Sequence, residues 1–363
     1  MNKKIVAQNR TVLLGVDVHT ASHVVSVKVV GQGMAGTCSM APSREAWRSF
    51  LRRFPGCELH VVYESGPHGY NLHDWLVELR EEYEGGAIFV YIAPPAMVPK
   101  APGRKRMKTD RRDSASLIQA FETKSFRPVV VPDRESREER ELVRTREQMM
   151  GMRKQLKNQI HGMVKSHGVE YPRQGAKWFG KWVEQLAVNV KSADTTGNLY
   201  YSFRVKLKML KETSAVISRL DKRIARLYEK GRCGETARKL SGLTGVGRLS
   251  AVIIATEVAD FAAFDNSDAF ASYVGVVPGE TSSGESTRRG HITRAGNRRL
   301  RWIFTECAWS WVRHDPEARR TFNRLRAGKH ERSKIAIVAM ARRLAVRAYH
   351  QVVNGPPQEA RAA

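Results

Sequence analysis

Four acidic residues stand where a fold could bring them around a metal ion. Asp17 follows the apolar segment LLGV, and Glu64 closes the similar segment LHVVYE. A charged group at the end of a buried strand costs free energy unless it has a partner or a function. Asp110 and Asp113 are three residues apart, so on a helix they would share one face. Since Mg²⁺ prefers several carboxylate oxygens from different elements, the four acids form a candidate Mg²⁺ site.

Such a site would suit phosphoryl transfer, because two ions about 4 Å apart can activate a nucleophile and stabilise the leaving oxygen. Each acid alone also has a simpler interpretation as a strand end, a surface ion pair or a favourable helix N-terminus. Basic residues around Asp110 could hold a phosphate backbone against the metals, although a basic loop without function is the alternative. These residues are Arg104, Lys105, Arg106, Lys108, Arg111 and Arg112.

A glycine turn in the segment LTGVGRLSA is a second candidate contact with nucleic acid. Gly245 and Gly247 resemble the turn of a helix-hairpin-helix, whose exposed backbone N–H groups can bind a phosphate. A packing corner between two helices is an equally good interpretation.

A loop dense in small polar residues, Pro278–Arg301, contains three serines close together. A serine can attack phosphorus if one group removes its proton and another stabilises the developing charge. Ser282, Ser283 and Ser286 are therefore candidates, while a flexible polar loop is the alternative. Basic and amide side chains in and after the loop are candidate nucleic-acid contacts: Arg288, Arg289, Arg294, Asn297 and Arg298.

The first ~130 residues have the pattern of an α/β domain. Short β-branched runs predict strands at residues 11–18, 23–30, 58–64 and 87–92, with a further apolar run at 128–132. Amphipathic stretches predict helices at residues 43–54 and 70–80, and Thr109 could cap a third. This order predicts a mixed sheet with helices packed on it.

From Asp133 onward the pattern becomes helical. Leu142, Met149, Leu156 and Met163 are seven residues apart, with Met152 and Ile160 on the same face, and Leu210, Ile217 and Ile224 repeat the spacing after a turn-rich stretch at 171–197. This spacing favours an antiparallel or intermolecular coiled coil, with an ordinary helical subdomain as the alternative. We expect three domains, at residues 1–132, 133–238 and 239–363.

The composition favours a polyanionic partner. The 363 residues include 62 Lys and Arg against 36 Asp and Glu, which gives a net charge of +26. The alternative is a ribosome-associated or merely soluble basic protein. The four scattered cysteines favour a reducing cytoplasm and argue against structural zinc. No apolar run approaches the ~20 residues that a membrane span requires.

The segments GVDVH, VVYESGPHGY and KTDRRDSASL occur in the order typical of a known family. With the C-terminal GLTGVG and YVGVVPGETSSGESTRRGHITRAGNRRLR, the chain resembles the DEDD transposases of insertion-sequence family 110, which include the Piv-type DNA invertases. The resemblance covers nearly the whole chain. His19 and Thr20 follow Asp17 where relatives often carry Ser-Lys.

The resemblance implies an N-terminal RuvC-like domain of RNase H type, with the DEDD set at Asp17, Glu64, Asp110 and Asp113. It implies a coiled-coil linker and a mostly α-helical C-terminal transposase domain with a nucleophilic serine, which Ser283 matches by motif position. It also implies a recombinase that acts on donor and target DNA with a structured bridge RNA. Because the acids and the serine lie far apart in the sequence, a composite site could join domains of different protomers, so we expect a homodimer or homotetramer. The alternatives are a RuvC-type nuclease or junction resolvase and a non-catalytic nucleic-acid-binding protein.

Overall fold

The computed structural model describes residues 8–66, 68–95, 110–172, 178–283, 286–292 and 295–355. The chain forms two compact units, Met1–Val131 and Pro132–Ala363. In these ranges, no helix is both long and apolar enough to cross a bilayer.

A five-stranded mixed sheet forms the centre of the first unit, in the order β3-β2-β1-β4-β5. Strand β2 is antiparallel to both of its neighbours, whereas β1, β4 and β5 run parallel. The predicted mixed sheet is therefore present. The strand bounds are β1 Thr11–Val18, β2 His23–Val29, β3 Gly33–Met40, β4 Glu58–Glu64 and β5 Ala87–Ala93.

Strand β3 was not predicted from the sequence. Its residues, GMAGTCSM, include no valine or isoleucine and lack the alternation of apolar and polar positions that marks a half-buried strand. The strand forms because a turn after β2 returns the chain along that strand, and its position at the edge leaves most of its side chains partly or fully exposed. The apolar run at 128–132 is neither strand nor helix, although Val129 donates a backbone hydrogen bond to Ile92.

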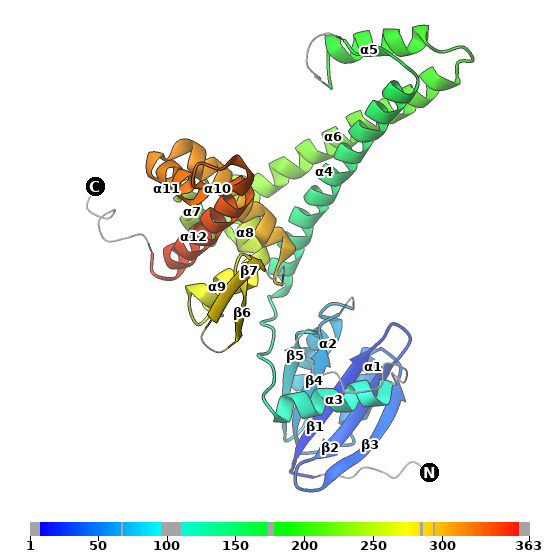
Figure 1. Cartoon of the computed structure of the whole chain (residues 1–363). Coiled ribbons are helices and arrows are strands. Elements are labelled where there is room, and N and C mark those ends of the chain that lie inside the picture. The colour runs from blue at the N-terminus through cyan, green and yellow to red at the C-terminus, as the bar shows by residue number, and fades with distance from the viewer. Residues whose placement is uncertain are drawn as a thin grey trace. The chain divides into compact units, whose positions relative to one another are not determined.

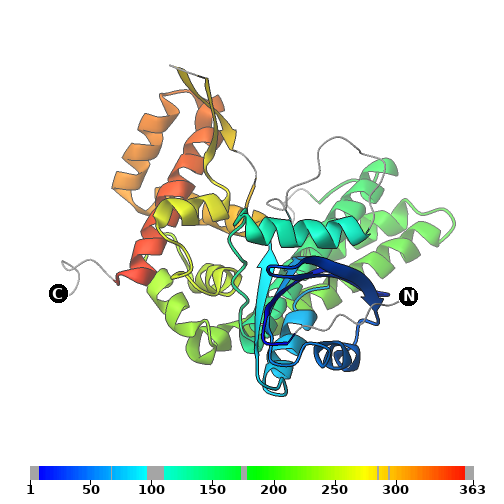
Figure 2. The same cartoon turned by 90° about the horizontal axis from the view of Figure 1, so that it is seen from below.

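Helices cover both faces of this sheet (Figures 1 and 2). On one face, α1 (Arg44–Leu51) and α2 (Asn71–Arg80) bury Trp47, Phe50 and Leu76 against the even-numbered side chains of β1. The hydroxyl of Ser43 caps α1 by accepting from the Ala46 N–H. Helix α3 (Asp110–Glu122) packs on the opposite face.

Two long helices, α4 (Arg134–Ser166) and α6 (Asn198–Lys230), run side by side in the second unit (Figure 1). Arg146 pairs with Asp221, and Glu139 accepts from the backbone of Arg232, so the two helices are antiparallel. Phe203, Leu210, Ile217 and Ile224, each seven residues apart, form the buried face of α6.

The predicted apolar seam on α4 is only partly correct. Leu156 and Ile160 are buried, but Met152 is 47% exposed, and Val143 and Val164 are buried in its place. The helix pair is present, and its coiled-coil character and the division into three domains remain predictions.

The stretch predicted as turn-rich contains a helix, α5 (Lys181–Ser192), at the far end of the pair (Figure 1). Its Trp182, Leu186 and Val190 are four residues apart, which is the spacing of one helix face, and they pack with Phe203 of α6. Burial against the ends of α4 and α6 therefore outweighs the surrounding turn residues.

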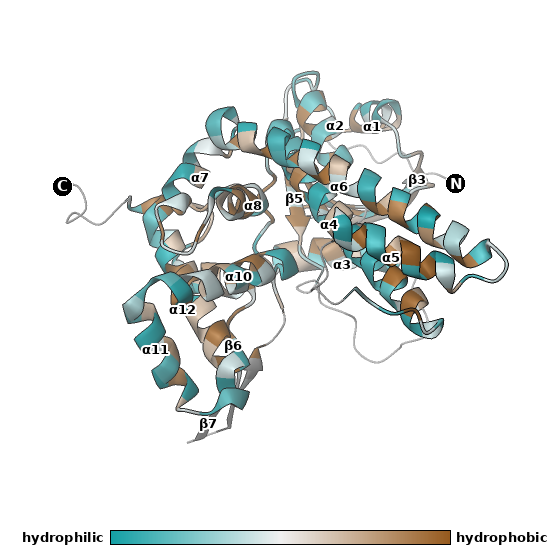
Figure 3. Cartoon of the chain, turned by 90° about the horizontal axis from the view of Figure 1, so that it is seen from above, coloured by the Kyte–Doolittle hydropathy of each residue, from teal (hydrophilic) through white to brown (hydrophobic). Residues whose placement is uncertain are grey.

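The remainder of the second unit is mostly helical, with the apolar helix α8 at its centre (Figure 3). A two-stranded hairpin stands where a flexible polar loop was the alternative. The bounds are α7 Gly234–Ser241, α8 Arg248–Val258, α9 Ser267–Val274, β6 Pro278–Ser283, β7 Ser286–Ile292, α10 Arg298–His314, α11 Pro316–Arg326, a 3₁₀ turn His330–Arg332, and α12 Ser333–Val353.

Candidate active site

Asp17 and Glu64 lie at the same level on two neighbouring parallel strands. The register of β1 against β4 pairs Gly15 with Val62 and Val16 with Tyr63. The next residue on each strand is Asp17 on β1 and Glu64 on β4. Adjacent strands are about 4.8 Å apart, so the two carboxylates start from neighbouring backbone positions.

Both acids face the side of the sheet that α3 covers. Side chains alternate between faces along a strand, so Asp17 shares a face with Gly15 and Glu64 shares one with Val62. A Cβ atom built on Gly15 would lie 1.9 Å from the carbonyl oxygen of Ser114 in α3. Val62 is buried with Leu117 of the same helix. Only glycine at position 15 allows the helix backbone to lie this close to β1.

Two contacts fix the direction of α3 along the sheet. The hydroxyl of Ser114 lies 2.7 Å from that of Ser26, which pairs with Gly15. Later in the helix, Glu122 binds Lys28 at 2.6 Å, and Lys28 pairs with Leu13, nearer the start of β1. The helix therefore runs antiparallel to β1, and its first turn lies at the end of the sheet that carries Asp17.

Three elements thus direct the DEDD acids to one end of one sheet face: β1 with Asp17, β4 with Glu64 and the first turn of α3 with Asp110 and Asp113. Glu64 and Asp113 are exposed. The carboxylate of Asp17 lies 3.1 Å from Nε2 of His19. The side chain of Asp110 is outside the description.

The donor set suits Mg²⁺, which prefers carboxylate oxygens supplied by several elements. Among the side chains that the structure describes, no three acidic, histidine or cysteine groups are close enough to hold a metal ion. The sheet and the first turn of α3 therefore place Asp17, Glu64 and Asp113 at the same edge, and the closure of a metal site by the four acids stays a prediction.

Most of the predicted basic contacts near these acids fall outside the described residues. These are Arg104, Lys105, Arg106 and Lys108. Arg111 lies in the first turn of α3, and only its backbone is described, whereas Arg112 is exposed on the same turn. Arg112 is therefore the predicted basic residue whose side chain is described near the acids.

The glycine turn connects α7 to α8, and its two glycines differ. Gly245 has φ +93, and an added Cβ would lie 2.6 Å from the backbone nitrogen of Trp311 and 2.7 Å from the carbonyl of Cys307. This glycine is needed for close packing against α10. Gly247 precedes the first turn of α8 and has open space around it. Of the two, only Gly247 has open surroundings, so it is the better candidate for a phosphate contact.

The candidate serines lie at the tip of the hairpin. Ser283 pairs with Ser286 and Ser282 with Thr287 across β6 and β7. The side chains of these serines and of Arg288 and Arg289 are outside the description, as is Arg294 as a whole. Placement at a hairpin end holds the serine backbone in a defined register, while the identity of the nucleophile stays a prediction.

Asn297 and Arg298, at the start of α10, differ in what their side chains do. Asn297 accepts from the backbone N–H groups of Arg299 and Leu300, which caps the helix, and it donates to Glu257 at 3.0 Å. Its amide therefore has internal partners on both sides, whereas Arg298 is exposed. Arg298 is the better placed of the two for a nucleic-acid contact.

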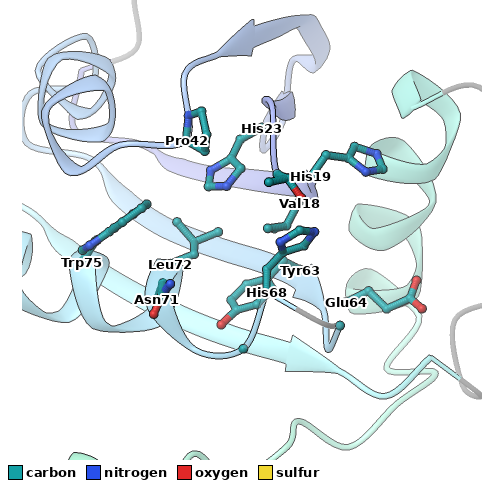
Figure 4. Close-up of a pocket in the computed structure, with 13 residues that line it drawn as sticks. Val18, His19, His23, Pro42, Tyr63, Glu64, His68, Asn71, Leu72 and Trp75 are labelled. Carbon is teal, nitrogen blue, oxygen red and sulfur yellow. The ribbon is translucent and has the colours of Figure 1, made fainter.

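Sequence reasoning missed a group of residues on the other side of the same sheet edge. A hollow of about 210 Å³ lies there, and Figure 4 shows His23, His68 and Trp75 around it. Burial, and then the neighbouring His68 and His19, lower the pKa of His23 to about 4. The signal in the sequence was a histidine in each of the segments GVDVH and SGPHG, namely His19 and His68, whereas His23 and Trp75 lie outside both segments.

Comparisons with known proteins bear on both ends of the chain. A family model of DEDD transposases of the IS110 type matches residues 14–168, and one described as the transposase IS116/IS110/IS902 family matches residues 237–323. The first match contains all four acids, and the second contains the glycine turn and the serine hairpin.

Curated relatives agree with these models. A putative transposase of Sinorhizobium fredii is 28% identical over 85% of this chain and 74% of its own length. A probable family 20 transposase of Pseudomonas aeruginosa is 26% identical over 90% of this chain and 92% of its own length. The transposase for insertion sequence element IS1111A of Coxiella burnetii is 26% identical over 59% of this chain and 57% of its own. The chain belongs to the IS110 family of DEDD transposases.

Proposed function

We propose that this protein cuts and rejoins the DNA strands of an insertion sequence, with a RuvC-like first unit and a serine nucleophile in the second. The register that puts Asp17 beside Glu64, at the end of the sheet where α3 begins, is the observation that supports the proposal most strongly. Asp17, Glu64, Asp110 and Asp113 would hold Mg²⁺, and the bound ion would stabilise negative charge on the scissile phosphate.

In the proposed cleavage step, the hydroxyl of Ser283 loses its proton and its oxygen forms a bond to phosphorus. The bond from phosphorus to one deoxyribose oxygen breaks, and that oxygen leaves as a hydroxyl after taking a proton. The diester is conserved as a phosphoserine link, so a free DNA hydroxyl can attack it and rejoin a strand without an external energy source.

The partners of this reaction are proposed on two grounds. The net charge of +26 supports binding to donor and target DNA and to a structured RNA. The family resemblance supports a bridge RNA that pairs with both DNA partners, and the distance in sequence between the acids and the serine supports a site shared between protomers of a homodimer or homotetramer. Sequencing the RNA that co-purifies with the protein tests the bridge RNA, because loops complementary to the two DNA partners should appear.

Trapping a covalent protein–DNA adduct tests the serine. The intact protein should form the adduct on a plasmid that carries the ends of the element, and Ser283→Ala should lose it. Ser218, which is exposed on α6, provides a matched control, and Ser218→Ala should keep the adduct.

Two results would assign the chemistry differently. Loss of the adduct in Ser282→Ala or Ser286→Ala, but not in Ser283→Ala, would move the nucleophile along the hairpin. Strand cleavage without any adduct would favour the hydrolytic alternative, a RuvC-type nuclease in which water attacks.

A further inference from the structure

The hollow beside Glu64 is formed by two connections at the carboxyl end of the sheet. The turn after β1 contributes His19 and Thr20, and the segment between β4 and α2 contributes Gly66, His68 and Gly69. Its floor includes Tyr63, which is 1% exposed. The hollow therefore opens at the same strand ends that carry Asp17 and Glu64.

The lining of the hollow is aromatic and nearly uncharged. Trp75 of α2 and His23 of β2 lie with ring centroids 6.4 Å apart, and Tyr63 adds a third ring. Nδ1 of His23 accepts a hydrogen bond from the indole of Trp47 at 2.9 Å, which fixes the ring in a neutral form with its proton on Nε2. Among the described lining residues, Glu64 is the one acid, and no lysine or arginine is present.

Polar groups at the rim could recognise a flat heterocycle. Asn71 at the start of α2 has an amide that can donate and accept, and His68 adds a second group of this kind. A phosphate would gain little inside the hollow, because the described lining offers no lysine or arginine to pair with it. A neutral aromatic ligand with hydrogen-bonding edges fits this chemistry better.

The position of the hollow relates it to the acids. Tyr63 and Glu64 are consecutive in β4, so their side chains leave the strand on opposite faces. In Figure 4, Glu64 points away from the hollow toward α3, whereas His68 and Trp75 surround the hollow. A nucleotide at this edge could thus have its phosphate beside the acids and its base on the other side of the strand ends.

We propose that the hollow binds one unpaired nucleobase of the nucleotide whose phosphate lies at the carboxylates. That the phosphate lies at the carboxylates rests on the proposed function. Binding of the base in the hollow does not require cleavage and can be tested separately. The base would stack on Trp75, with Asn71 and His68 contacting its edge. The stack on Trp75 would add affinity for any base, whereas the edge contacts would make Asn71 and His68 the residues that determine which base is preferred.

Binding of the full chain to single-stranded DNA tests this in the absence of divalent metal, so the result does not depend on catalysis. A 12-nucleotide oligomer of mixed sequence is compared with the same oligomer made abasic throughout. A stacked base contributes a few- to a hundredfold in affinity, so we expect Trp75→Leu to weaken binding to the normal oligomer about tenfold and to leave binding to the abasic one unchanged. Trp75→Phe should restore most of the loss.

Val77 lies on the same helix, is 38% exposed and does not line the hollow, so Val77→Ala serves as the control and should bind as the unchanged protein does. Photocrosslinking with 5-iodouracil in the oligomer should label the segment Tyr63–Trp75. The proposal would be overturned if Trp75→Leu lost the same affinity for the normal and the abasic oligomer. Crosslinks confined to other segments would also overturn it. Failure of cleavage with these results intact would count against the proposed reaction alone.

Discussion

Carboxylates in the two units of this protein have opposite surroundings. At the sheet edge of the first unit, Glu64 and Asp113 are exposed, and Asp17 contacts His19, which is itself exposed. In the second unit, Glu257 of α8 is 2% exposed and is bound on several sides.

The partners of Glu257 explain how it can be buried. Arg144 of α4 donates two hydrogen bonds, at 2.8 and 3.0 Å, and Asn297 donates a third at 3.0 Å. Burial acts to raise the pKa of Glu257, but the hydrogen bonds from Arg144 and Asn297 outweigh it and hold the pKa below its ordinary value. The acid joins α4, α8 and the start of α10.

The comparison separates two uses of an acidic side chain. A buried carboxylate with a bidentate arginine contributes to folding, because its removal leaves a charged partner unsatisfied. Carboxylates gathered at an open edge contribute little to folding and remain available to a ligand. We therefore expect substitutions of the acids at the sheet edge to lower activity, and substitution of Glu257 to lower the free energy of unfolding.

The largest expected effect is on activity at the sheet edge. Asp17→Asn keeps the shape of the side chain and removes its charge, so metal binding and strand cleavage should be abolished. The free energy of unfolding should change by less than about 1 kcal/mol, since the contact with His19 is exposed. Strand cleavage and thermal unfolding measure the two quantities, and retained recombination would remove the carboxylates from the mechanism.

The next largest effect is on stability in the second unit. Glu257→Ala leaves the guanidinium of Arg144 and the amide of Asn297 without their acceptor, and should lower the free energy of unfolding by about 3 kcal/mol. Chemical denaturation measures it, with Glu306→Ala on the exposed face of α10 as a control. A change as small as that of the control would contradict a structural role for Glu257.

The glycine turn offers a similar contrast between a residue needed for packing, Gly245, and a residue in open space, Gly247. Gly245→Ala adds a Cβ against Trp311 at a positive φ and should cost at least about 2 kcal/mol of stability. Gly247→Ala meets open space and should fold normally. If Gly247 contacts a phosphate, Gly247→Ala should fold normally but bind DNA more weakly, which a salt titration of the affinity would detect.

The smallest effect is a dependence of stability on pH in the first unit. The pKa of His23 is about 4 in the folded chain against an ordinary 6.5, so the unfolded chain binds the proton more tightly. Stability is therefore fully present above pH 6.5 and falls as the pH approaches 4, by roughly 1–2 kcal/mol between pH 7 and pH 5. His23→Gln should reduce this slope, and an unchanged slope would contradict the assignment.

The sequence alone determined the elements that carry the acids. Apolar runs with β-branched residues predicted β1, β2, β4 and β5 close to their observed bounds, because strand-forming residues and burial coincide there. The charge indicated a nucleic-acid partner, and the three DEDD segments together with the C-terminal segments indicated the family. Neither β3 nor α5 was predicted, since each forms through packing against a neighbouring element, β3 without a clear pattern of its own and α5 among turn residues.

Only the tertiary structure decided which residues meet. No local pattern specifies that β1 and β4 pair with Asp17 level with Glu64, because strand register depends on the packing of the whole sheet. The closeness of α3 to Gly15, the bond between Ser26 and Ser114, and the burial of Glu257 by Arg144 join residues at least 88 positions apart. Such contacts depend on three-dimensional packing, which local propensity does not encode.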